Sequence, residues 1–365
     1  MNIYFADRDF NILGMASTGL PGKEITQDVR TDEVGAAHVE LKIELTHAPE
    51  DFWTVRDWAK GGNYVFRGDV REDATVAAEL YNIIMNESDT GPDTCLFYAY
   101  SPGFELNNRT TIDYSSSIAR TIEDYIINIF GNGSDLYRFT IGVNEIPTRS
   151  RKLSWEGGTT LSERMVSLAN GFDAEISYRY IIDGLKVTKK LIDIYKRRGR
   201  DDPWDLRVGR EVKRIIIKEN VSEVCTALRV KGGIPEGGTD AITLEGYTYD
   251  DGDFYVHNNA LISRTANAKW GQNGQLYRTW SYDTTSQATL CSKAKAKLKK
   301  LREPVKEYEV ELYYTPPGLT AGTPVRVIDT VRGIYLTARL IRLEESVTDR
   351  NNVAYVDEYK EETET

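Results

Sequence analysis

Apolar and polar residues alternate with a period of two near both ends of this chain. In HVELKIELT the apolar side chains all fall on one side of that period, namely Val39, Leu41, Ile43 and Leu45. The pattern returns in EYEVELYY, PVRVID and YLTARLIRLEES, which lie between residues 307 and 346. Successive side chains of a strand point to opposite faces, so we predict half-buried strands at both ends. The turn signal DTGPD separates two β-rich runs, AAELYNIIMNES and TCLFYAYSP, and such short strands favour a small barrel or sandwich.

The middle of the chain has helical periodicity instead. In TTLSERMVSLANG, Thr160 and Glu163 form a T-x-x-E capping box and Gly171 ends the helix. The predicted buried stripe of this helix consists of Leu161, Met165, Leu168 and Ala169. Such a stripe is more typical of a core than of a ligand site.

Two further helices are predicted. The segment SSSIARTIEDYIINIFGNG has serines that can cap the first amides and Gly131 as the stop. Its apolar positions are Ile118, Ile122, Tyr125, Ile126 and Ile129. The last helix runs from about Ser286 to Arg302, with Thr284 and Gln287 as its capping box and Pro304 beyond it. Its lysines surround an apolar stripe, which favours a solvated helix face over phosphate contact.

A basic run, YKRRGRDDPWDLRVGREVKRIII, begins at Tyr195 and follows a predicted hairpin in FDAEISYRYIIDGLKVTKKLIDIY, whose turn is Asp183-Gly184. We interpret the run as the end of one strand, a turn from Arg200 to Pro203, and a strand leading into a buried Ile215 to Ile217 block. The acidic residues expected to pair with its arginines are Asp201, Asp202, Asp205 and Glu211. Neutralising Arg197 and Arg198 should therefore disturb stability or assembly rather than affinity for DNA.

The formal net charge of -10 argues against a protein that binds DNA or an anionic membrane with its whole surface. No apolar run approaches the roughly 18 residues that a membrane span needs. The N-terminus MNIYFADRDF lacks a basic start and an apolar core, so synthesis in the cytoplasm without secretion is expected. The three cysteines, Cys95, Cys225 and Cys291, form no C-x-x-C pair, which gives no support to a zinc knuckle or a disulfide framework.

Catalytic patterns are weak throughout the sequence. HAPED places His47 and Asp51 at a zinc-peptidase spacing, but neither His38 nor His257 supplies the H-x-H of a third ligand. DDGD at 250–253 lacks the spaced ligands of a calcium loop, and Gly22-Lys23 lacks the rest of a phosphate loop. No sequence feature singles out a glycosidase-type carboxylate pair. We therefore assign no catalytic, cofactor-binding or metal residue and expect a structural or binding protein.

The middle of the chain nevertheless resembles the hub module of siphophage tail-associated lysins, also called the prophage endopeptidase tail protein family. The resemblance rests on the order of four short elements: Gly158 to Phe172, Arg197 to Gly199, Gly209 to Ile215, and Thr226 to Gly232. The runs ELYNIIMNES and CLFYAYSPGFEL resemble the end of the family's first barrel. The last helix and the strands after it resemble its closing barrel, so the resemblance covers nearly the whole chain.

The resemblance implies a mixed α+β fold, mostly β, like a phage baseplate hub. It divides the chain into a first β-barrel at 1–110, an α+β region at 111–185 plus 236–303, a discontinuous second β-barrel at 186–235 plus 304–355, and a flexible tail at 356–365. It further implies a homotrimeric ring at the tail tip of a virion, without cofactors. Its implied partners are the distal tail protein, the tape measure protein and receptor-binding proteins.

The family often continues into a peptidoglycan-degrading domain, whereas this chain stops after the closing barrel, so we expect no enzymatic activity. The alternatives left open are a peptidoglycan-degrading tail lysin with an unrecognised carboxylate site and a carbohydrate-binding receptor module. The 22 Tyr and six Trp motivate the second, because aromatic faces stack on sugars. A hub of a contractile secretion apparatus or of a myophage shares the same implied fold.

Overall fold

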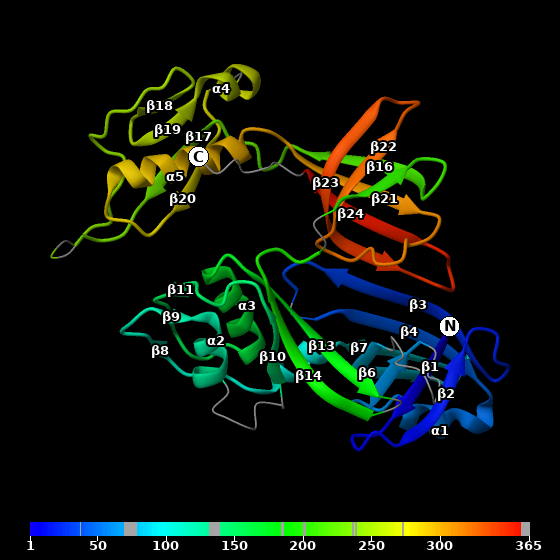
Figure 1. The fold of residues 1–365 in the computed structure, drawn as a ribbon. Helices are drawn as coiled ribbons and strands as arrows, with labels where there is room; N and C mark the ends of the chain where they lie inside the picture. The colour runs from blue at the N-terminus through cyan, green and yellow to red at the C-terminus, as the bar shows by residue number, and fades with distance from the viewer. Residues whose placement is uncertain are drawn as a thin grey trace. The chain divides into compact units, whose positions relative to one another are not determined.

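The structure is a computed structural model that describes residues 1–358 except 37, 69–78, 131–138, 184–185, 200–201, 236, 238 and 272–273. The chain forms two compact units, which are described separately (Figure 1). Unit 1 consists of Met1–Ile216 and Glu309–Thr365, and unit 2 of Ile217–Tyr308. No helix within the described residues is long and apolar enough to cross a membrane.

Unit 1 begins with a closed barrel of seven strands. The strands are β1 (Asn2–Ala6), β2 (Ile12–Ser17), β3 (Lys23–Glu33), β4 (Glu40–His47), β5 (Tyr64–Arg67), β6 (Glu79–Asp89) and β7 (Thr94–Tyr100). Their order is β3-β2-β1-β5-β6-β7-β4, and β4 pairs with β3 to close the ring. A short 3-10 turn, η1 (Pro49–Asp51), and helix α1 (Phe52–Trp58) follow β4. The predicted alternation in β4 is confirmed, because Leu41, Ile43 and Leu45 are fully buried in the barrel core.

Strand β3 differs from its neighbours in having charged side chains at buried alternate positions. Asp28 lies opposite Ile43 of β4 and Arg30 lies opposite Leu41. Both charged residues are buried, as is Asp32 further along β3. The alternation rule looks for apolar residues at such positions, so GKEITQDVRTDE was not recognisable as a core strand. These three charges become central to the site described below.

A helical layer and a long hairpin follow the barrel. The elements are η2 (Pro102–Asn108), β8 (Tyr114–Ser115), β9 (Arg120–Thr121), α2 (Ile122–Asp124), the π-helical η3 (Tyr125–Phe130), β10 (Phe139–Asn144), β11 (Ser150–Arg151), β12 (Ser154–Trp155), α3 (Leu161–Gly171), β13 (Glu175–Asp183) and β14 (Lys186–Tyr195). The predicted capping box at Thr160 and Glu163 is confirmed at the start of α3. The hairpin is also confirmed as the antiparallel pair β13–β14, although the predicted Gly184 turn lies outside the described residues.

The outer surface of the barrel packs against this hairpin. Tyr64, Phe66 and Leu80 of the barrel form one apolar cluster with Ile182 of β13. Beside this cluster, the Glu105 carboxylate accepts hydrogen bonds from the Tyr180 hydroxyl at 2.8 Å and the Lys190 ammonium at 2.5 Å.

A second sheet of six strands completes unit 1. The strands are β15 (Trp204–Arg207), β16 (Val212–Asn220), β21 (Val305–Leu312), β22 (Pro324–Asp329), β23 (Ile334–Glu345) and β24 (Asn352–Glu358), in the order β15-β22-β23-β24-β21-β16. Its two edge strands, β15 and β16, are consecutive in the chain and joined by a tight turn. The long strand β23 pairs with β22 through its first half and with β3 of the barrel through its second half. Strand β3 therefore belongs to both sheets.

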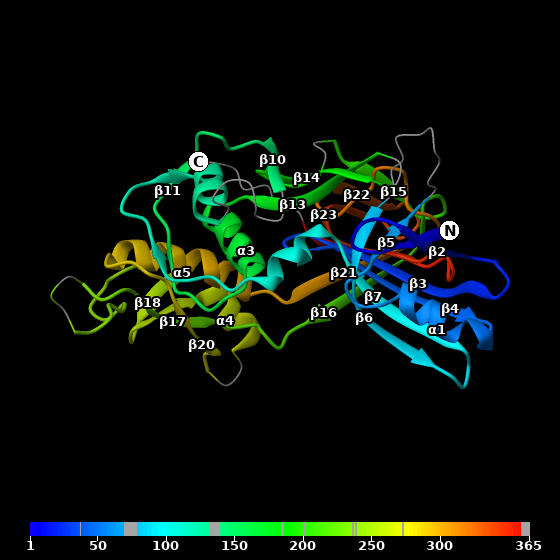
Figure 2. The same cartoon turned by 90° about the horizontal axis from the view of Figure 1, so that it is seen from below.

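Unit 2 is a four-stranded sheet with helices. It contains β17 (Ala227–Lys231), β18 (Phe254–His257), β19 (Ala260–Ser263), α4 (Arg264–Trp270), β20 (Tyr277–Ser281) and α5 (Gln287–Leu301). The strand order is β18-β19-β17-β20, and α5 lies along one face of the sheet (Figures 1 and 2). The predicted stripe of α5 is confirmed: Leu290, Ala294 and Leu298 are buried against that face.

Three local predictions are wrong. Helix α5 is capped by Ser286, whose hydroxyl accepts from the Thr289 amide, instead of by Thr284 with Gln287. Helix α2 is capped by Thr121 in a capping box with Asp124 instead of by the preceding serines, which leaves Ile118 exposed. In both helices the N-cap is the residue directly before the first helical residue, because its side chain reaches the free amides. Polar residues further upstream do not cap these helices.

The third concerns β16, where Ile215 and Ile216 are half-buried and Ile217 is 50% exposed. An edge strand has a neighbour on one side, so a run of apolar residues there need not be buried.

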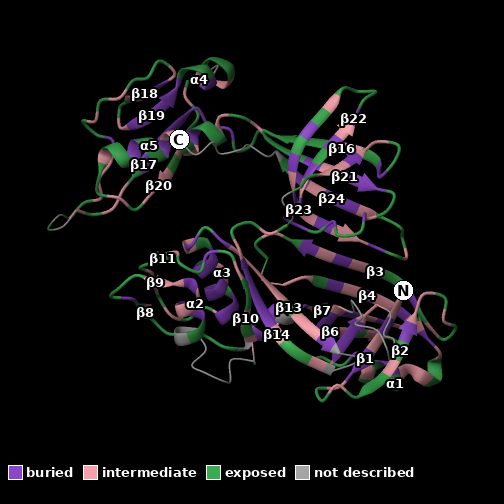
Figure 3. Ribbon diagram, in the orientation of Figure 1, coloured by how far each residue is buried: buried purple, intermediate pink, exposed green. Residues whose placement is uncertain are grey.

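The predicted fold class is confirmed. The chain is mostly β, with helices between two sets of strands, and the N-terminal part of unit 1 is a closed seven-stranded barrel. In Figure 3 buried residues alternate with less buried ones along the barrel strands, and much of α3 is buried.

Candidate functional site

A cluster of largely buried charged side chains in unit 1 lies where the barrel, the hairpin and the second sheet meet. We call it the arginine junction and define it as Asp32, Glu175, Arg198 and Arg339. Asp32 comes from β3, Glu175 begins β13, Arg198 follows β14, and Arg339 lies in β23. Four segments that are far apart in the sequence therefore contribute one charged side chain each.

Arg339 and Glu175 form a bidentate ion pair. The two guanidinium nitrogens donate to the two carboxylate oxygens at 2.7 and 2.6 Å. Arg339 also donates to the carbonyl oxygens of Gly322 at 3.0 Å and Arg198 at 3.1 Å. Its side chain is 14% exposed and that of Glu175 is 19% exposed, so solvent screens this pair much less than a surface pair.

Arg198 links the same carboxylate to the barrel. Its backbone amide donates to Glu175 at 2.6 Å, and its guanidinium donates to both oxygens of Asp32 at 2.6 and 2.7 Å. The Asp32 side chain is 1% exposed, so its charge depends on this partner for compensation. The basic run singled out in the sequence thus contributes a structural arginine.

Two glycines allow the backbones to approach at this point. Gly199 and Gly322 have φ values of +113° and +96°, which side chains rarely adopt. A Cβ on Gly322 would overlap the carbonyl oxygen of Arg198, and a Cβ on Gly199 would lie 2.5 Å from the carbonyl carbon of Gly322. The R-R-G sequence therefore places an arginine and a glycine where both are needed.

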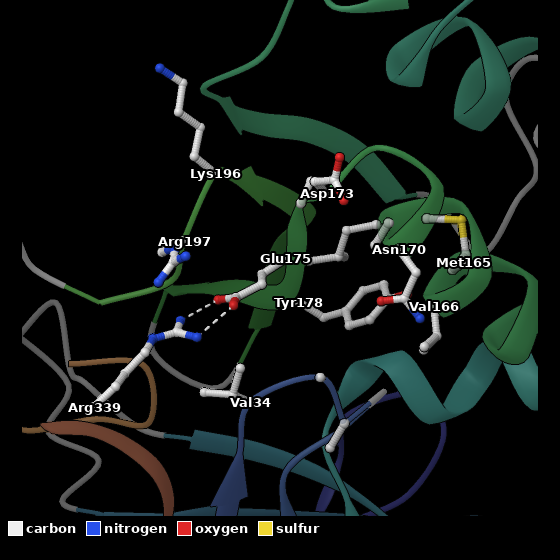
Figure 4. Close-up of a pocket in the computed structure, with 15 residues that line it drawn as sticks. Val34, Met165, Val166, Asn170, Asp173, Glu175, Tyr178, Lys196, Arg197 and Arg339 are labelled. Carbon is white, nitrogen blue, oxygen red and sulfur yellow. Dashed lines mark hydrogen bonds and ion pairs between the residues drawn. The ribbon is translucent and has the colours of Figure 1, made fainter. Parts of the chain in front are cut away.

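A cavity of about 430 Å³ opens beside the junction (Figure 4). Met165, Val166 and Ala169 of α3 line one side, and the Glu175–Arg339 pair lies on the other. Lys196 extends away from the ion pair toward the outside. The two charges of the pair neutralise each other, and the cavity presents no paired nucleophile and base.

A second charged network lies at the same end of the barrel. The Arg30 guanidinium donates to Glu79 of β6 at 3.0 Å and to Glu345 of β23 at 3.0 Å. Burial opposes the charge of Arg30, but the nearby Tyr81 and Glu79 outweigh it and raise the pKa of this guanidinium above its usual value. Arg30 and Arg67 likewise hold the pKa of the Glu79 carboxyl below its usual value, against the effect of its burial. This network joins the barrel to the second sheet independently of the arginine junction.

Asp28, the third charge of β3, holds the turn after β23. Its carboxylate accepts from the amides of Val347 at 3.0 Å and Thr348 at 2.8 Å. All three buried charges of β3 therefore bind the second sheet or the segment that precedes it. These contacts connect separate segments of unit 1, so their role is structural.

The residues weighed for zinc chemistry in the sequence already have protein partners. His47 is buried, and its Nδ1 lies 2.9 Å from the Ala48 carbonyl oxygen. Asp51 forms an ion pair with Lys23 at 2.6 Å. In the part of the chain that the structure describes, no group of three metal-type side chains comes together. The three cysteines are buried: Cys225 and Cys291, the latter in α5, lie in the core of unit 2, and Cys95 lies in the barrel core.

The acidic turn DDGD belongs to unit 2 and makes ion pairs there. Asp250 binds Arg264 through two hydrogen bonds of 2.8 and 2.7 Å, Asp251 pairs with Lys295, and Asp253 accepts from Arg302 at 2.5 Å. The turn thereby ties the β18 end of the sheet to α4 and α5. The hydrogen bond from Arg264 lowers the pKa of Asp250 to about 2, and the hydrogen bond from Lys295 lowers the pKa of Asp251.

These carboxyls predict a loss of stability of unit 2 in acid. Their pKa values in the folded state lie below the usual 3.8, so their contribution is present above pH 3.8 and disappears as the pH falls toward 2. We expect the melting temperature, followed by circular dichroism, to fall between pH 4 and pH 2, and to fall less in D250N. D240N is the matched control, because Asp240 contacts the neighbouring Thr239 hydroxyl. Identical pH profiles for the two variants would contradict the prediction.

Two of the four acidic residues in the basic run form ion pairs with arginines. Asp205 pairs with Arg207 at 2.8 Å and with Arg326 of β22 at 2.6 Å, and Glu211 pairs with Arg210 at 3.3 Å. Pairing of these two residues with arginines is thus confirmed, whereas Asp201 lies outside the described residues. The partners of Arg198, Asp32 and Glu175, were not expected from the sequence.

No family model and no curated protein matches this sequence. Solved structures do match it over nearly its whole length. The chain is similar to prophage tail protein gp18 from Listeria monocytogenes EGD-e (11% identity, 99% of this chain and 95% of that one, TM-score 0.56) and to a tail protein from Neisseria meningitidis MC58 (11% identity, 98% and 96%, TM-score 0.58). It is also similar to the 43 kDa tail protein of prophage MuSo2 from Shewanella oneidensis (14% identity, 99% and 98%, TM-score 0.56). At these identities the likeness shows that the chain has the fold of these tail proteins.

Proposed function

We propose that this chain is a structural hub protein at the tail tip or baseplate of a tailed bacteriophage or prophage, of the kind found in the hub module of tail-associated lysins. The observation that carries the proposal is the likeness of fold to three tail proteins, two of them from prophages, over 98–99% of the chain. In this role three copies form a ring that docks onto the distal tail protein and closes or guides the DNA exit channel. The division into a first barrel, an α+β region and a discontinuous second barrel at the boundaries given above stays a prediction of this proposal.

The polar chemistry of unit 1 supports a structural role. A single charged side chain is costly to bury. In unit 1 such charges are paired, and the ion pairs link β3 to Arg198, β3 to β23, and β23 to β13. A ring subunit needs such fixed geometry, because its interfaces must repeat from copy to copy. A trimer also has a formal charge of -30 (three times -10), which disfavours binding of DNA phosphates to a channel wall.

The proposal predicts a trimer. Light scattering coupled to size-exclusion chromatography should give three times the chain mass of 41.3 kDa for the protein alone, or the mass of three chains plus the bound distal tail protein after mixing. Electron microscopy of the particle should show a threefold ring at the tail tip. A mass of one chain in both conditions, at concentrations well above those in an assembling cell, would overturn the proposal.

Neither alternative gains a specific observation. A lytic band in a zymogram on purified cell walls would establish the lysin. For a carbohydrate-binding module, exposed aromatic side chains should gather in a groove. Among the residues that the structure describes, the most exposed aromatic side chains are Trp53 of α1 and Tyr335 of β23, and neither lines the cavity at the arginine junction.

A further inference from the structure

An apolar patch lies on the outer surface of the barrel, toward the turn between β6 and β7. It consists of Met85, Leu96 and Tyr98, which the strand register places next to one another on the side that faces away from the barrel core. Met85 is 50% exposed, and Leu96 and Tyr98 are partly exposed. Lys42 of β4 lies over the Tyr98 ring, 5.7 Å from its centre. Neighbouring apolar side chains of this kind form a candidate contact surface.

Carboxylates stand on both sides of this patch. Glu87 of β6 and Glu44 of β4 are the two neighbours of Leu96 in one row across the sheet. The next row has Asp89 at one end and Glu24 at the other. Among the described residues, none of these four carboxylates has a cationic nitrogen within 4 Å. We call this surface the acidic face and define it as Glu24, Glu44, Met85, Glu87, Asp89, Leu96 and Tyr98.

Helix α5 of unit 2 has the opposite charge. It contains five lysines and no acidic residue between Gln287 and Leu301. Asp251 pairs with one of them, Lys295. Within the described part of the chain the other four have no carboxylate within 4 Å, namely Lys293, Lys297, Lys299 and Lys300.

The exposed side of α5 is formed by Lys293, Ala296 and Lys300. All three are exposed, and their spacing of three and four residues places them in line along the helix. We call them the lysine side of α5. Because Ala296 is small, the helix backbone between the two lysines can approach another surface closely.

The two surfaces match in spacing as well as in charge. Lys293 and Lys300 are seven residues apart, which is about 10 Å along a helix. Glu87 and Glu44 are separated by two strand spacings, which is also about 10 Å. The lysine side thus has a small residue between two cations, and the acidic face has Leu96 between two carboxylates.

The formal charge of the whole chain is divided in the same sense. Unit 2 has 13 Lys and Arg against 11 Asp and Glu, which leaves 33 against 45 for unit 1 (46 minus 13 and 56 minus 11). Unit 2 is therefore +2 and unit 1 is -12. Opposite charge on two surfaces of one chain favours contact between copies in which unlike surfaces meet.

We propose that the lysine side of α5 in one copy docks on the acidic face of the next copy. Lys293 and Lys300 pair with Glu87 and Glu44, and Ala296 packs on Leu96. A contact between two different surfaces of identical chains is head-to-tail, and such contacts produce rings when the rotation closes. This inference rests on the proposed ring of three copies and names the surfaces that meet in it.

Charge reversal tests the pairing. We expect K293E/K300E and E44K/E87K each to weaken association of the copies about tenfold or more at low salt, because each places like charges opposite one another. The mass is measured by light scattering in the condition in which the parent forms a trimer. K189E/K231E is the matched control, since it reverses two exposed lysines in β14 and β17. It should assemble as the parent does.

The combined variant with all four reversals guards against simple misfolding. It restores opposite charges across the contact, so it should assemble more tightly than either double variant. Failure of this rescue, or equal losses in K189E/K231E and K293E/K300E, would overturn the inference while the parent remains a trimer. A parent that stays a single chain overturns the proposed function itself, and the inference with it.

Cross-linking shows whether the contact joins two copies. The parent is assembled from equal amounts of unlabelled and isotope-labelled chains and treated with a carbodiimide, which links lysines directly to adjacent carboxylates. We expect linked peptides that join Lys293 or Lys300 to Glu44 or Glu87, with one labelled and one unlabelled partner in a large share of them. Links found only between peptides of the same label would place the contact within one chain and overturn the inference. Links from these lysines to other carboxylates alone would overturn it as well.

Discussion

Replacement of Arg339 by methionine is expected to lower the free energy of unfolding of unit 1 by about 3 kcal/mol, because it leaves Glu175 half-enclosed without its cation. The loss also removes the hydrogen bonds from Arg339 to the carbonyl oxygens of Gly322 and Arg198. Urea denaturation gives the free energy, and hydrogen exchange read by mass spectrometry assigns the loss to a unit. Amides of β13, β22 and β23 should exchange faster, and those of α5 in unit 2 should not change.

A second variant distinguishes the ion pair from simple loss of packing. In R339M/E175M both charges are gone, so the part of the loss that comes from an unpaired buried charge should return. The hydrogen bonds to the carbonyl oxygens of Gly322 and Arg198 and from the Arg198 amide stay lost. K269M is the surface control: Lys269 and Glu303 form an ion pair whose side chains are 55% and 54% exposed, and its loss should cost less than about 1 kcal/mol. A double variant no more stable than R339M would show that the pair itself is not what stabilises the junction.

Replacement of Gly322 by alanine is the other change with a large expected effect. The added Cβ would overlap the carbonyl oxygen of Arg198 and lie 2.7 Å from its carbon, at a φ of +96°. Overpacking typically costs about 1–3 kcal/mol and a left-handed alanine about 1–2 kcal/mol, so we expect a loss of about 3 kcal/mol or more. The variant should unfold at lower urea concentration or accumulate as insoluble protein.

G318A isolates the effect of close approach. Gly318 has a similar φ of +83°, but a Cβ there meets no atom within 4 Å. G318A should therefore cost only the conformational part, about 1–2 kcal/mol. If G318A and G322A unfold at the same urea concentration, the contact between the two backbones contributes nothing to stability.

The arginine junction was only partly visible in the sequence. The basic run draws attention to Arg198, and R-R-G indicates a strand end with a constrained turn. Its partners cannot be found in the same way, because Asp32 is 166 residues from Arg198 and Glu175 is 164 residues from Arg339. Local periodicity contains no information about which distant charges will meet. A buried charge is also indistinguishable from a surface charge until the surrounding strands are in place.

Local structure, in contrast, could be predicted from the sequence where the preferred backbone geometry and the burial of the side chains agree. The strand of β4, the hairpin β13–β14 and the capping box of α3 follow from alternation and from hydrogen bonding within a few residues. The wrong predictions concern the caps of α2 and α5 and the burial of β16. At the caps, two neighbouring residues compete for one amide. In β16, an edge strand leaves apolar residues uncovered.

The sequence by itself determined the mostly β class, the positions of the main strands and of α3 and α5, and a charge balance unsuited to binding DNA over the whole surface. Only the tertiary structure decided that β3 is shared by the barrel and the second sheet. It also decided that the buried Asp28, Arg30 and Asp32 of β3 all contact the second sheet or the segment before it. The physical reason is that periodicity reports which side of an element is apolar, whereas the partner of a charge depends on chain segments that come together only when the protein folds.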